Sequence, residues 1–361
     1  MAFYCQINFS FSDVYSITFK HHHHHPALTK SVDSQQSVPS CSSTVCSASS
    51  TDSESTTASP QTPILPEHLA LKRLHDKTLS DARQTRLAQQ DLRTEMELLA
   101  SLPAHPHIVE LYGISSLSSS SSSLFLIQQQ LTTTLESKMV LWRRQQIKQK
   151  VSSGNLLLQQ TLRILSVAVD LTSALQCLHK HDVVYRDVKP ANVGFDADGQ
   201  VRLFDFGFCR RLEETSERPL TMCLGTLPYV APEVCRTQSY YMGEEEENNY
   251  RPYGLPVDVY GLGCVLWELL TLQDLPVEKR TTRRPRWKSL VIAPQRRKKQ
   301  TPLVEVFQAH AQTPVQPVMD QVQSQEMQAL IRECVSSNPL ERPTMALVHE
   351  RLQAEVRRVL G

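Results

Sequence analysis

Glycine is scarce in this chain of 361 residues: there are 11, and the first is Gly113. Glycine-rich loops hold phosphates because a backbone without side chains lets N–H groups come close to the phosphate oxygens. The sequence before Gly113 therefore excludes a loop of that kind.

The chain has no excess of charge of either sign and no long hydrophobic run. Lys plus Arg total 38 against 37 Asp plus Glu, a net charge of +1, which argues against a dedicated binder of nucleic acid or anionic membranes. No apolar run reaches the ~18 residues that span a bilayer, and residues 1–6 do not resemble a secretory signal. We expect a soluble, cytoplasmic protein, with a nuclear location left open, no membrane span and no nucleic-acid partner.

The nine cysteines also exclude some classes of site. They are odd in number and scattered, and none forms the C-x-x-C pair of a zinc or redox motif. We interpret them as reduced thiols.

Several segments have a biased composition. The run His21–His25 leads into a tract rich in Ser, Thr, Gln and Pro at about 30–62, which has too few apolar residues to offset the entropy of ordering. We predict a low-complexity insertion at about 21–65, with histidines that are passive rather than metal-binding. Further insertions are predicted at about 242–252, which is acidic, and about 279–318, which is basic at its start. Charge runs are usually solvated loops, with docking of a partner as the alternative.

Hydrophobic periodicity divides the rest into two parts. The first alternates like a strand at 1–20 and 69–74, is helical at about 80–102, and returns to strands at 107–113 and 124–127. The second is dominated by helical periodicity, as at 161–180 and 257–270. We predict an α+β fold of two lobes, a small and mainly β lobe at 1–131 and a larger, mainly α lobe at 132–361.

The most informative stretch is Tyr185-Arg186-Asp187-Val188-Lys189-Pro190-Ala191-Asn192, followed by Asp205-Phe206-Gly207. It resembles the catalytic loop and metal-binding triplet of the eukaryotic protein kinases. Phosphoryl transfer depends on positioning and charge neutralisation. The resemblance implies that Asp187 orients the attacking hydroxyl, that Asn192 and Asp205 bind Mg²⁺, and that Lys189 neutralises charge on the transferred group.

The resemblance extends from about Leu69 to Leu360. Gly225-Thr226 and Ala231-Pro232-Glu233 match the end of the family's activation segment, and Asp258 to Gly263 match the start of its buried central helix. Asn338 to Pro343 match the segment whose arginine pairs with the glutamate of A-P-E. A buried ion pair between Glu233 and Arg342 is implied.

In the first part, Ala70-Leu71-Lys72 looks like the family's V-A-I-K strand. Lys72 would bridge the α- and β-phosphates of ATP and Glu95 would hold it, with Glu97 as the competing partner. The strand at 124–127 would place Gln128 at the gatekeeper position. The adenine would then meet the backbone near Gln129 and Leu131, and Val14 would cover it.

The segment before Val14 departs from the family pattern. Ser12 stands at the third glycine of the nucleotide loop, and Ile7 and Phe9 stand at the first two. Such side chains should hinder the approach of the backbone to phosphate. Two explanations compete: a weakened, nucleotide-deficient kinase fold, or a wrongly assigned start that replaces a glycine-bearing strand, which we prefer.

The run D-x-K-P-x-N around Lys189 resembles serine/threonine kinases. We therefore expect a protein serine/threonine kinase that uses ATP and Mg²⁺ on protein substrates. The alternative is a pseudokinase that acts as a scaffold. Arg186 implies a cationic pocket for a phosphorylated activation loop, with Thr215, Ser216 and Thr221 as candidate acceptors. The oligomeric state and the physiological substrate stay open.

Overall fold

The structure, a computed structural model, describes part of the chain. The described residues are 7–8, 12–18, 68–74, 82–115, 124–148, 154–212, 225–236, 253–276, 310, 312, 314 and 317–361. The predicted insertion at 21–65 lies outside these residues, as do the acidic insertion and almost all of the basic one. So do Phe9 and the candidate acceptors Thr215, Ser216 and Thr221.

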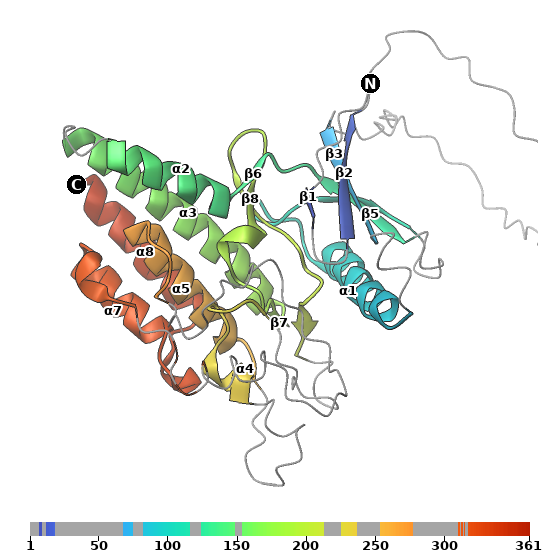
Figure 1. Cartoon of the computed structure of the whole chain (residues 1–361). Helices are drawn as coiled ribbons and strands as arrows, with labels where there is room; N and C mark the ends of the chain where they lie inside the picture. Colours follow the sequence, from blue (N-terminus) through green and yellow to red (C-terminus); the bar gives the residue numbers. More distant parts are fainter. Residues whose placement is uncertain are drawn as a thin grey trace, which may run out of the picture.

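The first part of the chain forms an antiparallel sheet with one helix against it (Figure 1). Its strands are β1 (Ile7–Asn8), β2 (Ser12–Thr18), β3 (His68–Leu74), β4 (Leu111–Ile114) and β5 (Phe125–Gln129). They lie in the order β1-β2-β3-β5-β4, and helix α1 (Ala82–Ser101) packs against β3 and β4. This is the mainly β lobe that the sequence predicts.

Helix α1 forms because its apolar residues recur every three or four positions. Ala88, Leu92 and Met96 are 2% exposed or less and pack with the strand residues Leu74 and Leu126 in a small core. A stripe of this kind turns one face of the helix toward the sheet. It thereby determines which polar residues of the helix face the space between the lobes.

The strand predicted at 107–113 is wrong over its first half, because β4 begins only at Leu111. The peptide groups of His107 and Val109 bond to Leu203 in the second lobe, with N···O distances of 2.8 and 2.9 Å. Ile108 and Val109 are buried in the core of that lobe. The apolar residues of this segment alternate as in a strand, but they pack against the other lobe.

The second lobe is mainly helical, as predicted (Figure 1). Its helices are α2 (Leu135–Lys148), α3 (Gly154–Lys180), α4 (Pro232–Arg236), α5 (Pro256–Thr271), α7 (Gln325–Cys334) and α8 (Met345–Leu360), with short 3-10 helices η3 (Pro190–Asn192), η6 (Met319–Gln321) and η7 (Pro339–Glu341). Its short strands are β6 (Thr133–Thr134), β7 (Val183–Val184), β8 (Val193–Phe195), β9 (Val201–Leu203) and β10 (Arg210–Arg211). Strands β6, β8 and β9 form one antiparallel sheet, and β7 pairs with β10.

Helix α3 is long and apolar, and it starts at Gly154, before the predicted residue 161. Its part Leu157–Lys180 has the length and composition of a membrane-crossing helix, alone among the described helices. Within this part, 56% of an apolar stretch of 18 residues is buried inside the protein. Helix α3 also packs along α8. Leu171 and Leu175 are fully buried, so the apolar composition is that of a core helix of the lobe.

Helix α5 is the central helix, with 13 of its residues buried. Gly263 lets α7 approach closely, because a Cβ there would lie 2.6 Å from Cβ of Cys334. Leu272 ends α5 in a left-handed conformation, with φ of 52°. Arg143 of α2 donates from Nε to the carbonyl of Leu272, at 2.5 Å. This hydrogen bond gives a partner to one of the carbonyl groups at the end of the helix.

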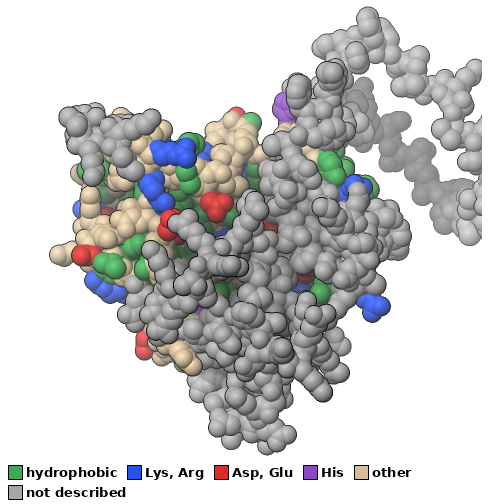
Figure 2. Space-filling view, viewed as in Figure 1, with side chains coloured by type: hydrophobic (Ala, Val, Ile, Leu, Met, Phe, Trp, Pro, Cys, Tyr) green, Lys and Arg blue, Asp and Glu red, His purple; other side chains and the backbone are tan. Residues whose placement is uncertain are grey.

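The described surface mixes charges of both signs. On the face shown in Figure 2, acidic and basic side chains are interspersed with hydrophobic ones. Arg351 of α8, for example, lies 2.8 Å from Glu326 and 2.5 Å from Glu333 of α7. Exposed pairs of this kind contribute at most about 1 kcal/mol each.

Candidate active site

The carboxylate of Asp187 is held from three sides. The side chain is 5% exposed, in the loop between β7 and η3. Its Oδ1 accepts a hydrogen bond from Thr226 Oγ1 at 2.8 Å, and its Oδ2 accepts from Lys189 Nζ at 2.6 Å and Asn192 Nδ2 at 2.9 Å. The residues that the sequence places in one motif therefore converge on a single carboxylate.

Thr226 joins the activation segment to this loop. Its hydroxyl donates to Asp187 and accepts from Lys189 Nζ at 2.8 Å. The sequence marks Thr226 only as part of the match to the end of the family's activation segment and does not predict these contacts. They depend on two segments, 39 residues apart, folding side by side.

Asp258 of α5 organises the backbone of the catalytic loop. Its Oδ2 accepts from the peptide N–H of Tyr185 at 2.8 Å and its Oδ1 from that of Arg186 at 2.7 Å. His179 Nε2 lies 3.0 Å from the same carboxylate, and Arg186 has a positive φ of 70°. Sequence reasoning missed this role. The available signal was an acidic residue in the first turn of a very apolar helix.

Lys72 connects the two lobes. Its Nζ lies 2.5 Å from Glu95 Oε2 on α1 and 2.8 Å from Asp205 Oδ1 in the large lobe. Glu95 is 1% exposed and points inward, whereas Glu97 is exposed. Of the two glutamates left open by the sequence, Glu95 is the one that pairs with Lys72.

Burial and neighbouring charges shift the pKa values of Lys72 and Asp205 in opposite directions. Burial alone lowers the pKa of Lys72, but Asp205 and Glu95 outweigh it and hold the pKa above its usual value. Burial raises the pKa of Asp205, and Lys72 more than offsets this, so that the pKa is lowered. Lys72 therefore carries a positive charge and Asp205 a negative one.

Tyr185 replaces the histidine that is usual at this position in the protein kinases that the sequence resembles. It is fully buried, and its hydroxyl donates to the carbonyl of Phe204, immediately before Asp205. Its ring packs edge to face on Phe206, with the centroids 5.5 Å apart. Burial raises the pKa of the phenol well above its usual value, so the hydroxyl stays protonated and holds the backbone just before Asp205 in place.

Asn192 and Asp205 suit a divalent cation. The peptide N–H of Phe204 donates to the carbonyl of Asn192 at 3.2 Å, which brings both segments together. Asn192 bonds to Asp187 through its amide nitrogen, which leaves the carbonyl oxygen as its ligand group. The described residues contain no cluster of three or more His, Cys, Asp or Glu able to hold a metal. Two protein oxygens suit Mg²⁺, which takes its other ligands from water and phosphate.

The other predicted nucleotide contacts lie in β2 and in the segment between the lobes. Val14 is 8% exposed and pairs with Lys72 across β2 and β3. Gln129 ends β5, and its Nε2 donates to Asp196 Oδ2 at 3.2 Å. Leu131 follows two residues later and packs against the core of the large lobe. Gln128 is 5% exposed, and its Oε1 has no partner among the described residues.

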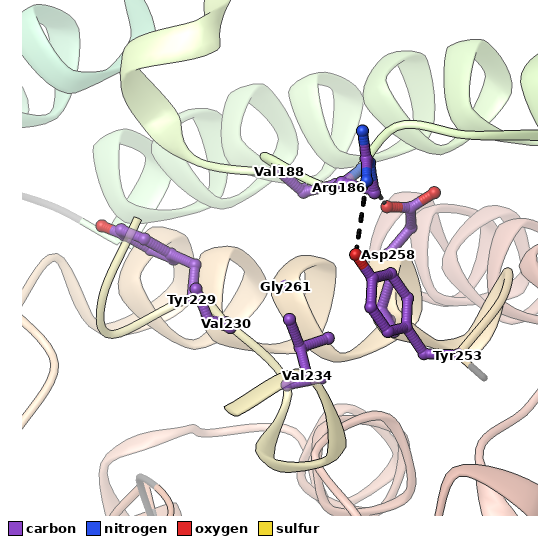
Figure 3. A pocket seen from close by; sticks show the side chains of 10 residues that line it. Arg186, Val188, Tyr229, Val230, Val234, Tyr253, Asp258 and Gly261 are labelled. Carbon is purple, nitrogen blue, oxygen red and sulfur yellow. Dashed lines mark hydrogen bonds between the residues drawn. The ribbon is translucent and has the colours of Figure 1, made fainter. Parts of the chain in front are cut away.

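Arg186 borders a cavity of about 10 Å³ beneath the catalytic loop (Figure 3). Its Nη1 donates to the hydroxyl of Tyr253 at 3.3 Å, and its Nε to the carbonyl of Phe208 at 2.5 Å. Its Nη2 is buried and has no partner among the described residues. A space of this size holds about one water molecule, so it is a gap in the packing rather than a substrate site.

Glu233 and Arg342 form the ion pair that the resemblance implies. Arg342 Nη1 lies 2.6 Å from Glu233 Oε1, and its Nη2 lies 2.8 Å from Oε2. The arginine also donates to the carbonyls of Pro256 and Ser336. This pair ties α4 to the segment before α8 and stands apart from the groups that converge on Asp187.

Comparison with known proteins identifies the family. Residues 66–353 match the protein kinase domain. Over 206 residues, 57% of this chain, the sequence is 29% identical to the serine/threonine-protein kinase Nek1 of Mus musculus, covering 14% of that protein.

Two shorter matches agree with this. Protein kinase 2 of Dictyostelium discoideum is 38% identical over 109 residues, 30% of this chain and 20% of that protein. The RAC-beta serine/threonine-protein kinase of Homo sapiens is 40% identical over 101 residues, 28% of this chain and 18% of that protein. The chain thus spans less than a quarter of the length of these relatives. The match to the protein kinase domain covers most of the chain, and the chain belongs to the protein kinase family.

Proposed function

We propose that this chain is a protein serine/threonine kinase that transfers the γ-phosphoryl group of ATP to serine or threonine hydroxyls of proteins. The observation that carries the proposal is the arrangement around Asp187, whose carboxylate is held by Thr226, Lys189 and Asn192. A carboxylate oriented in this way can accept a hydrogen bond from an incoming hydroxyl. The whole chain, 1–361, would be one kinase domain with its lobes meeting near residue 131.

In this mechanism the protein residues mainly position and neutralise. Asp187 orients the substrate hydroxyl and takes up its proton as the new O–P bond forms and the bond between the β- and γ-phosphates breaks, leaving ADP. Lys72 holds the α- and β-phosphates and is itself held by Glu95. Lys189 neutralises charge that develops on the transferred group.

Asn192 and Asp205 would hold Mg²⁺, which when bound neutralises the phosphate oxygens. The base of ATP would lie between the lobes, with Val14 above it and the backbone of Gln129 and Leu131 at its edge. The class of acceptor is supported by Lys189 and Thr226, which contact each other beside Asp187. The names of the matched relatives support the same class.

The test is γ-phosphate transfer from Mg-ATP by the purified full chain, to itself and to a generic protein substrate. Asp187→Asn serves as the control, and acid hydrolysis of the product identifies the phosphorylated amino acid. We expect phosphoserine or phosphothreonine from the unmodified chain. We expect transfer at least about a hundredfold slower from the variant, the usual contribution of a positioned base. Equal, background transfer by both would overturn the proposal.

A pseudokinase scaffold is the second candidate, and one observation favours it. Ile7 lies in β1, paired with Val14, at a position where the nucleotide loop of the family has glycine. Glycine at that position lets the backbone approach phosphate closely, and the sequence has isoleucine there instead. Titration with Mg-ATP followed by calorimetry separates the candidates, since a kinase must bind Mg-ATP and a scaffold need not.

A further inference from the structure

Gly194 lies in the middle strand of the three-stranded sheet, directly after the catalytic loop. It is buried in β8, paired with Arg202 of β9 and Thr134 of β6. Its neighbours Val193 and Phe195 are 0% and 2% exposed and belong to the core of the large lobe. Because side chains alternate along a strand, position 194 faces the opposite side of the sheet from Val193 and Phe195.

The side chain of Leu131 fills the space on this opposite face. A Cβ at position 194 would lie 2.5 Å from Cδ1 of Leu131 and 3.3 Å from both its Cβ and its Cγ. Non-bonded carbon atoms in proteins do not approach each other as closely as 2.5 Å. Glycine at 194 therefore lets Leu131 sit against the strand, and a larger residue at 194 would displace it.

Leu131 comes from the segment that joins the lobes. It follows β5 by two residues and precedes β6, while Gly194 follows Asn192 by two residues. Leu131 thus covers the strand that leaves the catalytic loop, on the face opposite to the side chains of Val193 and Phe195. Its side chain is only partly buried, so it offers an apolar surface beside the segment that connects β5 to the large lobe.

We propose that the side chain of Leu131 forms the large-lobe face of the nucleotide-base site, in the space that Gly194 leaves free. The inference rests on the proposed function, which places the base between Val14 and this segment. A purine has two flat, weakly polar faces, and an aliphatic side chain covers such a face through dispersion and removal of water. Leu131 then supplies affinity for the base and none for the phosphates.

A swap of side chains tests this on the full chain. Three variants are compared with the unmodified chain: Leu131→Ala, Gly194→Leu, and the two together. Calorimetry gives Kd for Mg-ATP and for Mg-tripolyphosphate, which carries the charges without a base. We expect Leu131→Ala to weaken Mg-ATP about tenfold, the loss of part of a leucine contact, and to leave tripolyphosphate unchanged.

The other variants make the test specific. Gly194→Leu alone should weaken Mg-ATP, because its side chain collides with Leu131. The double variant should return to within about threefold of the unmodified chain, since a leucine from β8 then fills the same space. Leu102→Ala, a partly buried leucine after α1, is the matched control and should leave both Kd values unchanged. Thermal unfolding of every variant checks that it is folded.

Three results would overturn the inference. One is an unchanged Kd for Mg-ATP in Leu131→Ala, and another is an equal loss of affinity for Mg-ATP and tripolyphosphate. The third is a double variant that is no better than the worse single one. Failure of the proposed function looks different: the unmodified chain would bind Mg-ATP, and respond to these variants, without transferring phosphate. If the unmodified chain bound no Mg-ATP, both proposals would fall together.

Discussion

Two buried carboxylates of the large lobe, Asp258 and Glu268, accept hydrogen bonds from different groups. Asp258 accepts two peptide N–H groups and lies beside His179. Glu268 accepts from the hydroxyl of Tyr229 at 2.7 Å and the peptide N–H of Leu275 at 3.1 Å, yet burial dominates and raises its pKa to about 7. Glu268 thereby changes charge near neutral pH beneath the segment that carries Tyr229.

This raised pKa predicts a pH dependence of stability. The folded state favours the neutral form of Glu268, so its contribution is fully present below about pH 4.5 and is lost as the pH rises through about 7. Between pH 5.5 and 8 the unmodified chain should lose about 2 kcal/mol relative to Glu268→Gln. Urea unfolding of both at each pH measures the difference. A difference between them that does not change with pH would contradict the assignment.

At the scale of elements, single contacts hold separate helices together. Arg342 lies under Tyr260 of α5, with the guanidinium carbon 5.1 Å from the ring centre, while it pairs with Glu233 of α4. Its side chain is fully buried, and that of Glu233 is 15% exposed. Val234 and Cys235 anchor α4 in the core of the large lobe, and the ion pair adds a link from α4 to the segment before α8.

Removing the arginine should therefore be costly. Arg342→Met leaves Glu233 and two carbonyl groups without their donor, and we expect the free energy of unfolding to fall by about 3–5 kcal/mol. Arg351→Met is the matched control, because its partners are exposed, and we expect a loss of at most about 2 kcal/mol for its two ion pairs together. Denaturant titration compares the two. Equal losses would show that burial of the Arg342 pair has no special weight.

For the whole molecule, the important link is the one that Lys72 makes between the lobes. Lys72 and Glu95 belong to the small lobe, and Asp205 follows β9 in the large lobe. The same boundary is crossed by Gln129, which bonds to Asp196 beyond β8. These contacts hold Lys72, which we propose binds phosphate, beside the predicted metal ligand Asp205.

The two glutamates of α1 test this link. Glu95→Gln removes a charged partner of Lys72, and we expect kcat/KM for phosphate transfer to fall by about 10- to 100-fold, the usual weight of one charged hydrogen bond. Glu97→Gln changes an exposed residue two positions away and should stay within about twofold. Steady-state kinetics with Mg-ATP measures both. The reverse order of effects would assign the pairing to Glu97.

Most of the fold was predictable because its signals are local. Periodicity identified the strand at 69–74, the helix α1 and the central helix α5. Each of these elements is buried on one face or almost completely, and its apolar residues follow that pattern of burial. The segment at 107–110 was predicted as a strand because its apolar residues alternate. Its partner is Leu203, almost a hundred residues later, and no local pattern contains that information.

The same division holds for the site. The sequence by itself determined the chemical groups and their order, because Asp187, Lys189 and Asn192 lie within six residues of one another and a short loop brings them together. Only the tertiary structure decided which glutamate meets Lys72 and where Leu131 lies. Those contacts join segments that are far apart in the sequence, and the packing of helices and strands sets which side chains face each other.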